Sequence, residues 1–325
     1  MVRSKLRDKS WRINQIAVPA FDTAVEATVE FVLFASFGGA GGVRVRRLNA
    51  ISIDIEDWYH PELVVRAGGT VEPTPHIERS ADIILSLLKR INCNATFFIL
   101  GQIAERHPAL VRKIFDEGHE IASHGMSHTP LWRQNAQSFD SELKQFEKTI
   151  RGILKGVRVK GYRAPTFSLD CSTAWALDVL AENGYVYDSS VFPMKNRLYG
   201  VAGAPLGIYR PSASDPSRHD EAGRILEFPP AVLQIGPVKV PVAGGAYLRL
   251  LPGRLWISLL RIAESQRPLM IYVHPWECDP LTPRLPLGLL STFVTYYGIG
   301  TACEKLQMLL REFQCSRIDE VLGIE

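Results

Sequence analysis

The sequence lacks three features that would assign it to a protein class at once. Its 325 residues contain no apolar run of the roughly 18 to 20 residues that a membrane-spanning helix needs. Its net charge is 37 − 34 = +3, too small to indicate a nucleic-acid partner or a charged membrane surface. The five cysteines are far apart and form no CxxC pair, which argues against a disulfide framework or a thiolate zinc site. Reduced thiols are typical of the cytoplasm, so we expect a cytoplasmic protein, with membrane association as an open alternative.

The chain contains enough apolar residues for a folded core. Its N-terminal segment has an unusual composition. Hydrophobic residues make up 46% of the sequence and charged residues 22%, as in ordinary globular proteins. After a basic start, an apolar stretch is interrupted by Asp22, Glu26 and Glu30. Its unbroken part therefore begins too late for a signal peptide. We expect residues 1–46 to form a poorly ordered extension or a surface helix.

Residues 47–325 have the pattern of one catalytic α/β domain. Short apolar segments with strand patterns alternate with segments of helical periodicity, and this recurring order predicts a parallel sheet. Residues 193–253 are rich in proline and glycine and lack this alternation. We interpret them as a loop-rich elaboration of the same domain rather than a separate one.

Three polar clusters follow predicted strands, at the edge where α/β folds place their active sites. The first is acidic and contains Asp54, Glu56 and Asp57. The second contains His124 and His128, four residues apart around a Gly and a Ser, a spacing with which two imidazoles can reach one metal ion. Taken alone, each cluster has an ordinary structural explanation, such as a solvated strand end.

The third cluster is a late histidine, and an arginine lies between it and the second. His274 follows the apolar segment 268–273 and could act as a general acid or base. Arg163 follows another predicted strand and could orient a carboxylate through paired hydrogen bonds. Together the clusters supply three ligands for a metal ion, namely two histidines and a carboxylate. They also supply a base, an orienting cation and an acid. An open metal site of this kind leaves room for the water that hydrolysis requires.

In this order, the motifs resemble those of the polysaccharide deacetylases of carbohydrate esterase family 4, the NodB-homology group. The resemblance extends over residues 49–279 and is most specific in Asn94–His128 (NATFFILGQIAERHPALVRKIFDEGHEIASHGMSH). The version of the first motif, SIDIEDW, together with GGAYLR and HPWECD, resembles one subgroup that accompanies exopolysaccharide and PEP-CTERM (exosortase) gene clusters. The resemblance implies a distorted (β/α) barrel of NodB type, with seven strands and a loop-rich insertion.

The resemblance also implies the metal ligands, but it leaves the carboxylate open. His124 and His128 match the metal motif of the family, and the ion implied is Zn²⁺, with Co²⁺ or another divalent ion as alternatives. Strand alternation places Asp54 and Glu56 on one face, which favours Glu56 as the third ligand. A turn beginning after Ile55 would present Asp57 instead. We expect Asp57 and keep Glu56 as the alternative.

By this resemblance the protein removes N-acetyl groups from an amino-sugar polysaccharide. Asp54 would take a proton from the attacking water, Arg163 would hold Asp54, and His274 would protonate the departing amine. The implied partners are an N-acetylated polysaccharide or oligosaccharide and, through the subgroup, exopolysaccharide assembly machinery; no nucleic acid is expected. The substrate-binding candidates are mainly aromatic and basic: Tyr59, Pro165, Tyr247, Arg249 and Trp276.

Two other functions remain open on the same scaffold. One is hydrolysis of another C–N amide bond in a small molecule, for which a closed pocket rather than a long groove would be typical. The other is a carbohydrate-binding protein without catalysis. The presence of Asp54, His124, His128 and His274 argues against the second.

Overall fold

The computed structural model describes residues 46–66, 75–196 and 198–324. The predicted extension, residues 1–46, lies outside the described residues except for its last position. Within the described part of the chain, no helix combines the length and the apolar character that crossing a membrane would require.

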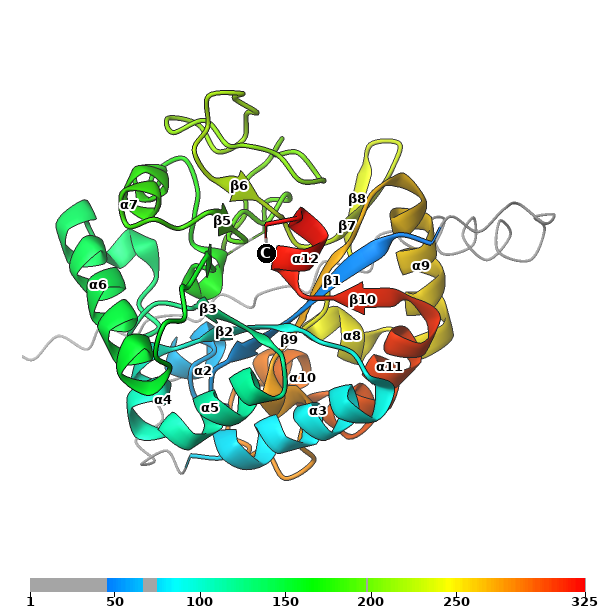
Figure 1. Cartoon of the computed structure of the whole chain (residues 1–325). Coiled ribbons are helices and arrows are strands. Elements are labelled where there is room, and N and C mark those ends of the chain that lie inside the picture. Colours follow the sequence, from blue (N-terminus) through cyan, green and yellow to red (C-terminus); the bar gives the residue numbers. More distant parts are fainter. Residues whose placement is uncertain (1–45, 67–74, 197, 325) are drawn as a thin grey trace, which may run out of the picture. The chain divides into compact units, whose positions relative to one another are not determined.

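The centre of the fold is a parallel sheet built from short, buried strands (Figure 1). Its hydrogen-bonded order is β10-β1-β2-β3-β4-β5-β6, and β9 also pairs with β1. Seven of eight residues in β1 are buried, as expected for a strand covered on both faces. The bounds are β1 Leu48–Ile55, β2 Thr96–Ile99, β3 Glu120–Ser123, β4 Gly161–Tyr162, β5 Tyr187–Asp188, β6 Leu226–Glu227, β9 Met270–Val273 and β10 Gln314–Ser316.

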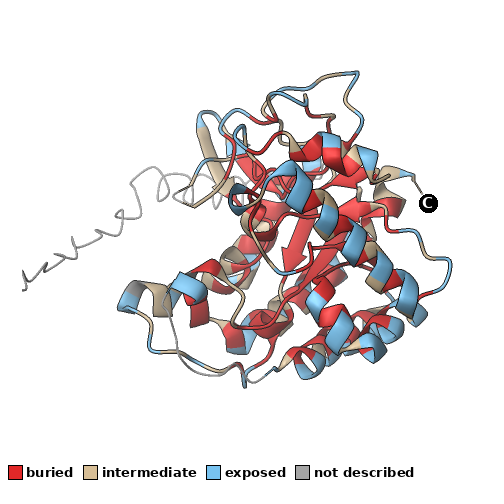
Figure 2. Cartoon of the chain, turned by 90° about the vertical axis from the view of Figure 1, so that its left-hand side faces the viewer, coloured by how far each residue is buried: buried red, intermediate tan, exposed pale blue. Residues whose placement is uncertain are grey.

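Amphipathic helices cover the outside of this sheet. Figure 2 shows buried residues on the strands and on the inner helix faces, with exposed residues on the outer faces. Helix α6 begins with a capping box in which Asn135 and Ser138 bond each other's backbone N–H groups. The α-helices are α2 Glu62–Arg66, α3 Ile77–Ile91, α4 Gly101–Arg106, α5 Pro108–Asp116, α6 Ala136–Ile153, α7 Ala176–Glu182, α8 Ala246–Leu250, α9 Gly253–Gln266, α10 Leu289–Tyr296, α11 Ile299–Glu312 and α12 Ile318–Leu322. Three 3₁₀ turns are η1 Leu131–Arg133, η2 Pro165–Phe167 and η3 Pro275–Cys278.

The barrel is closed irregularly between β6 and β9. An antiparallel hairpin, β7 (Val232–Ile235) and β8 (Val238–Pro241), occupies this region. The N–H of Ala231 donates to Met270 in β9, and the N–H of Tyr272 donates to Ala243. Gly244 bridges to Tyr272 so closely that a Cβ there would lie 1.7 Å from the Tyr272 carbonyl oxygen. Only glycine fits this position, where the two segments touch.

The predicted distorted, seven-stranded barrel is confirmed, with one addition. The path from β9 through β1 to β6 contains the seven strands, and the short β10 adds an eighth beside the start of β1. The elaboration at residues 193–253 is loop-rich as predicted, yet it also contributes β6 to the barrel. Because the strands are parallel, their carboxyl ends meet at one edge, and the candidate site lies there.

Candidate metal centre and active site

The polar clusters from distant parts of the sequence meet around one cavity at the carboxyl ends of the strands. The cavity has a volume of about 190 Å³. Two larger hollows beside α4 and α6, of about 490 and 500 Å³, have no histidine in their walls. The site cavity is lined by Asp54, Glu56, Pro61, Glu62, His124, His128, Arg163, Ala164, Thr166, Phe167, Leu198, Tyr199, Tyr272, His274 and Trp276.

Glu56, His124 and His128 form a group that could hold a metal ion. One ligand atom from each lies within 4.8 Å of the others. The carboxylate Oε2 of Glu56 is 2.6 Å from Nε2 of His128 and 3.9 Å from Nε2 of His124. Two imidazole nitrogens and one carboxylate oxygen are a ligand set typical of open zinc sites. The residues therefore fit a divalent ion of this kind.

Local structure holds the two histidines in place. Nδ1 of His124 lies 2.8 Å from the carbonyl oxygen of Arg163, so Nδ1–H donates and Nε2 keeps its lone pair toward Glu56. Burial lowers the pKa of His124 to about 4, which favours the neutral, metal-binding form. His128 has a φ of 55°, a left-handed conformation that is costly for histidine. The preceding loop is clamped by Glu142, whose carboxylate accepts from the N–H groups of Met126 and Ser127.

The structure does not place Asp57, the expected carboxylate ligand, with the histidines. Its Oδ1 accepts from its neighbour Trp58, and its Oδ2 accepts from the N–H groups of His76 and Ile77 at the start of α3. A carboxylate there satisfies helix donors that would otherwise be unpaired. Strand alternation continues one residue past β1, so Glu56, the alternative, is the acid that faces the histidines.

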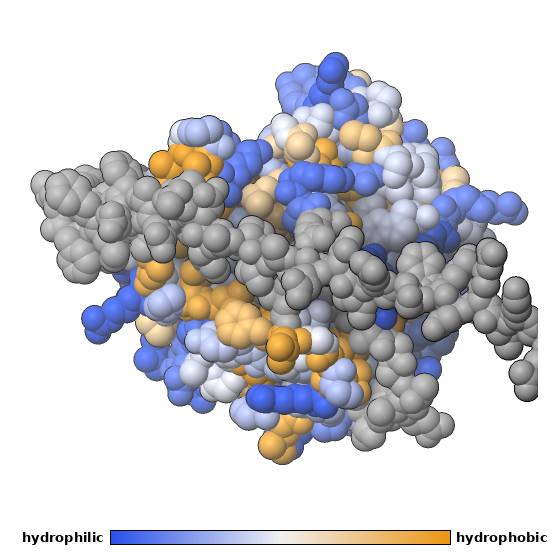
Figure 3. All heavy atoms as spheres, turned by 180° about the vertical axis from the view of Figure 1, so that it is seen from behind, coloured by the Kyte–Doolittle hydropathy of each residue, from blue (hydrophilic) through white to orange (hydrophobic). Residues whose placement is uncertain are grey.

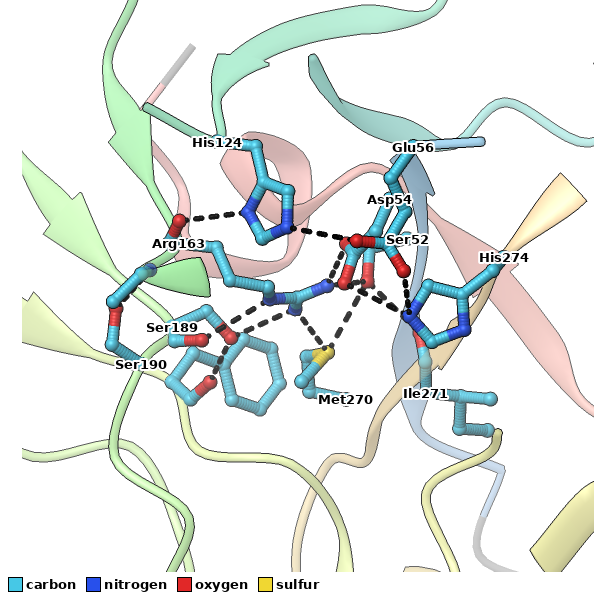
Figure 4. Close-up of polar contacts among 12 residues, drawn as sticks. Ser52, Asp54, Glu56, His124, Arg163, Ser189, Ser190, Met270, Ile271 and His274 are labelled. Carbon is cyan, nitrogen blue, oxygen red and sulfur yellow. Dashed lines mark hydrogen bonds and ion pairs between the residues drawn. The ribbon is translucent and has the colours of Figure 1, made fainter. Parts of the chain in front are cut away.

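Asp54 and Arg163 form a buried pair beside the metal group (Figure 4). Nη1 of Arg163 donates to Asp54 Oδ1 at 2.5 Å and to the hydroxyl of Ser52 at 2.8 Å. The other side of the guanidinium donates to the backbone and hydroxyl oxygens of Ser189. The guanidinium also lies 4.0 Å from the ring centroid of Phe98. These contacts fix Arg163, so Asp54 can turn only its second oxygen toward the cavity.

His274 lies on the side of Asp54 that is opposite to Arg163, and Glu277 orients its ring. Its Nδ1 is 2.9 Å from Glu277, three residues later in η3. Its Nε2 is 3.3 Å from Oε1 of Glu56 and 3.8 Å from Oδ2 of Asp54. Burial opposes the charged form, but Glu56 and Glu277 outweigh it and raise the pKa of His274 to about 9. The arrangement can therefore hold a proton facing both acids.

Of the predicted substrate-binding residues, the structure brings one to the cavity wall. Trp276 lines the cavity and stacks on His274, with ring centroids 5.6 Å apart. Tyr59, Pro165 and Tyr247 are not in the lining. Tyr59 instead packs against the cluster that contains Trp58 and Trp276.

The prediction of Arg249 as a substrate-binding residue is wrong, because its guanidinium is buried and each of its nitrogens donates a hydrogen bond within the protein. Its Nε donates to Glu277 at 2.8 Å, and its two other nitrogens donate to the carbonyl oxygens of Tyr297 and Val294. The side chain is 3% exposed. Arg249 thus ties η3, which carries the orienting Glu277, to the end of α10.

Sequence reasoning missed several residues that shape the site. Thr166 and Phe167 line the cavity in left-handed conformations, with φ of 59° and 47°. Ser52 and Ser189 hold Arg163, and Glu142 holds the histidine loop. A capping-box spacing could have identified Glu277, but Glu142 lies 14 residues beyond His128 and carries no local signal.

Comparison with known proteins matches two consecutive parts of the chain. Residues 70–187 match the family model "Polysaccharide deacetylase", and residues 189–323 match a domain family of unknown function, DUF3473. A chitooligosaccharide deacetylase of Rhizobium leguminosarum bv. trifolii is 32% identical over 34% of this chain and 47% of its own. A peptidoglycan-N-acetylglucosamine deacetylase of Bacillus cereus is 36% identical over 30% of this chain and 33% of its own. The matches span less than half the length of these relatives.

Over residues 70–187 the chain is similar to polysaccharide deacetylases. A crystal structure of a Mycobacterium smegmatis protein, proposed to be a polysaccharide deacetylase, has the same fold: 18% identity, 88% and 92% of the two chains covered, TM-score 0.54. The polysaccharide deacetylase match contains His124, His128 and Arg163. Asp54 and Glu56 precede it, and His274 lies in the DUF3473 match. The candidate site is thus assembled from the deacetylase-type segment and both of its flanks.

Proposed function

We propose that the protein is a metal-dependent deacetylase that removes N-acetyl groups from an amino-sugar polymer. One observation carries the proposal. The ligand group Glu56–His124–His128, the Asp54–Arg163 pair and His274 face one cavity at the carboxyl ends of the barrel strands. These are the parts that hydrolysis of an amide requires: a metal site, a base and an acid.

The metal site would be held by Glu56, His124 and His128. A divalent ion bound there supplies a water of lowered pKa and polarises a carbonyl group. Burial keeps His124 neutral, and the bond from its Nδ1–H to the Arg163 carbonyl oxygen fixes the tautomer that leaves the Nε2 lone pair available for such an ion. Zn²⁺ is the ion that best suits two nitrogens and one oxygen.

Asp54 is the proposed base. Its Oδ1 is occupied by Arg163, so the second oxygen, Oδ2, is the one free to accept a proton from the attacking water. Arg163 keeps the carboxylate oriented and offsets its charge in a buried site. Because Ser52 and Ser189 hold the guanidinium, Asp54 cannot turn away from the cavity.

His274 is the proposed acid. Its Nε2 faces the cavity between Asp54 and Glu56, and Glu277 fixes the ring from the other side. A proton on Nε2 can therefore reach the nitrogen of the departing amine. The products would be acetate and a sugar with a free amino group, which is positively charged at neutral pH.

The substrate class is an N-acetylated amino-sugar chain. Aromatic side chains from Phe167, Tyr199, Tyr272 and Trp276 form much of the cavity wall and suit the apolar faces of sugar rings. The named activities of the two relatives above support the same class. Because the subgroup motifs lie partly in the DUF3473 match, we extend the proposal to an exopolysaccharide and its assembly machinery.

Acetate release from N-acetylglucosamine oligomers tests the proposal. Metal-stripped protein should release none, and addition of Zn²⁺ or Co²⁺ should restore release. His124→Ala should abolish both metal binding and release. Asp54→Asn should bind the metal with wild-type stoichiometry but lose activity by about 100-fold or more, in line with loss of a general base.

The control variants separate the possible failures. Binding of one metal ion per chain without acetate release from any N-acetylated sugar would contradict the deacetylase assignment and retain the metal site. Absence of metal binding would contradict the catalytic function altogether.

A further inference from the structure

In the described chain, helix α10 carries an apolar stripe that is exposed at one residue and half exposed at two others. Leu289, Phe293 and Tyr297 follow one another at four-residue intervals, so they lie on one face of the helix and its C-cap. They are 94%, 50% and 50% exposed. Figure 3 shows apolar surface gathered on the lower part of the face seen from behind. We call Leu289, Phe293 and Tyr297 the α10 patch.

The other large exposed apolar residues of the described chain lie each on a different element or loop. Phe115 and Trp132, for example, lie on different elements, α5 and η1. Isolated exposed apolar side chains are normal on soluble proteins, whereas a contiguous set marks a contact surface. The rings of Phe293 and Tyr297 contact each other, with centroids 4.8 Å apart, so these two members of the patch form one surface.

The charges around the patch indicate the kind of partner. Residues 280–303 contain no aspartate or glutamate, and their single charged residue is Arg284. Arg284 is exposed, and its guanidinium lies 6.0 Å from the ring centroid of Tyr296 on α10. A segment of apolar and aromatic side chains that carries one cation and no carboxylate of its own is suited to the interface of a membrane with anionic headgroups.

The inner side of the same helix reaches the candidate site. Tyr296 packs in one cluster with Trp58, Trp276 and Ile299, and Trp276 lines the cavity. Arg249 fixes the end of α10 to Glu277, the residue that orients His274. A surface held against α10 would therefore lie close to the mouth of the cavity.

We propose that the α10 patch docks the protein on an anionic phospholipid surface, where the site can act on sugar chains held at that membrane. This inference deepens the proposed function and rests on it. The patch is too small for insertion across the bilayer, so it would place the helix in the headgroup region as a reversible contact. The small net charge of the chain does not oppose this contact, because the relevant charge is local.

Flotation with vesicles tests the proposal on the full chain. The vesicles contain phosphatidylcholine with phosphatidylglycerol in a ratio of roughly three to one, a composition with an anionic surface. The wild-type protein should float with them. Leu289→Asp/Phe293→Asp should reduce the bound fraction by about tenfold or more, because two apolar contacts are lost and two like charges are added. Phe115→Asp, on the exposed side of α5, is the matched control and should bind like the wild type.

Two readouts keep this inference separate from the proposed function. Acetate release from soluble oligosaccharides should be unchanged in Leu289→Asp/Phe293→Asp, since neither side chain lines the cavity. Loss of flotation with intact acetate release is the expected result. Equal flotation of wild type and variant, or no flotation of the wild type, would overturn the docking proposal even if acetate release is retained. A wild-type dimer in light scattering that the variant abolishes would also overturn it, because a second copy would then be the partner.

Discussion

Glu56 and Asp57 are adjacent acids with different tasks, because the chain turns between them. Glu56 continues the alternation of β1 and faces His124 and His128. Asp57 turns toward α3 and accepts the N–H groups of His76 and Ile77. One acid thus belongs to the candidate metal centre, and the other stabilises a helix start.

Alanine substitution should separate these two tasks. Glu56→Ala should weaken Zn²⁺ binding by more than about 100-fold, since even residues that only support metal ligands commonly contribute 10- to 100-fold. Asp57→Ala should keep near-wild-type metal affinity but lower the free energy of unfolding by about 1–2 kcal/mol, as for a lost helix cap. Metal titration by calorimetry and chemical denaturation measure the two effects. The assignment fails if Asp57→Ala, and not Glu56→Ala, abolishes metal binding while the fold is retained.

At the scale of single residues, the sequence can predict most of the side chains of the candidate site, but not all of the residues that they contact. His124, His128, Asp54 and His274 can be identified because each follows an apolar segment, and parallel strands bring such positions together. The choice between Glu56 and Asp57 depends on where the strand ends, to within one residue. The structural role of Arg249 could not be predicted. Its buried partners, Glu277 and two carbonyl oxygens, come from segments whose contact the sequence does not indicate.

Among the elements, β4 and β5 are short and depend on a close backbone approach. Each strand is two residues long, and their register pairs Gly161 with Tyr187. A Cβ on Gly161 would lie 2.0 Å from the Tyr187 ring, which is fully buried. Strands of this length show no periodicity, so their exact partners could not be predicted from sequence. The longer strand β1 and the helices α3 and α6 could be predicted from the sequence, because their apolar spacing extends over many residues.

Two glycine substitutions test this contact. Gly161→Ala should lower the free energy of unfolding by about 1–3 kcal/mol, the usual effect of overpacking a core. Gly152→Ala is the control: Gly152 is a helical residue in α6 where an added Cβ would meet nothing within 4 Å, and alanine should add up to about 1 kcal/mol. Urea denaturation measures both. Equal effects of the two substitutions would show that Tyr187 moves aside and that the β4–β5 contact is not tight.

At the scale of the whole molecule, the two edges of the parallel sheet have different roles, one in function and the other in stability. The carboxyl ends carry the candidate site, whereas the amino ends are covered by α12 (Figure 1). The parallel sheet could be predicted because strand and helix patterns alternate along most of the chain, whereas its closure into a barrel is implied by the family resemblance alone. The irregular closure could not, since residues 231 and 243–244 reach β9 through backbone contacts without a sequence pattern.

Glu120 joins several elements at the amino edge. Its carboxyl group accepts from Thr96 in β2 and Tyr187 in β5, and from the N–H of Asp319 in α12. Burial, followed by the nearby Asp319 charge, raises its pKa from 4.5 to about 7. The folded protein therefore holds a proton on Glu120 that the unfolded chain releases at lower pH.

This proton should make stability fall with rising pH. A raised pKa in the folded state stabilises the fold fully below pH 4.5, and the contribution is lost as the pH rises through about 7. In Glu120→Gln the loss between pH 4.5 and 7.5 should be smaller by up to about 3 kcal/mol, from about 1.4 kcal/mol per pKa unit. Denaturation of both proteins across this range measures the difference, with the exposed Glu105→Gln as control. Parallel pH profiles for Glu120→Gln and wild type would mean that Glu120 is ionised in the folded protein, and that the amino edge of the barrel holds a buried charge rather than a neutral acid.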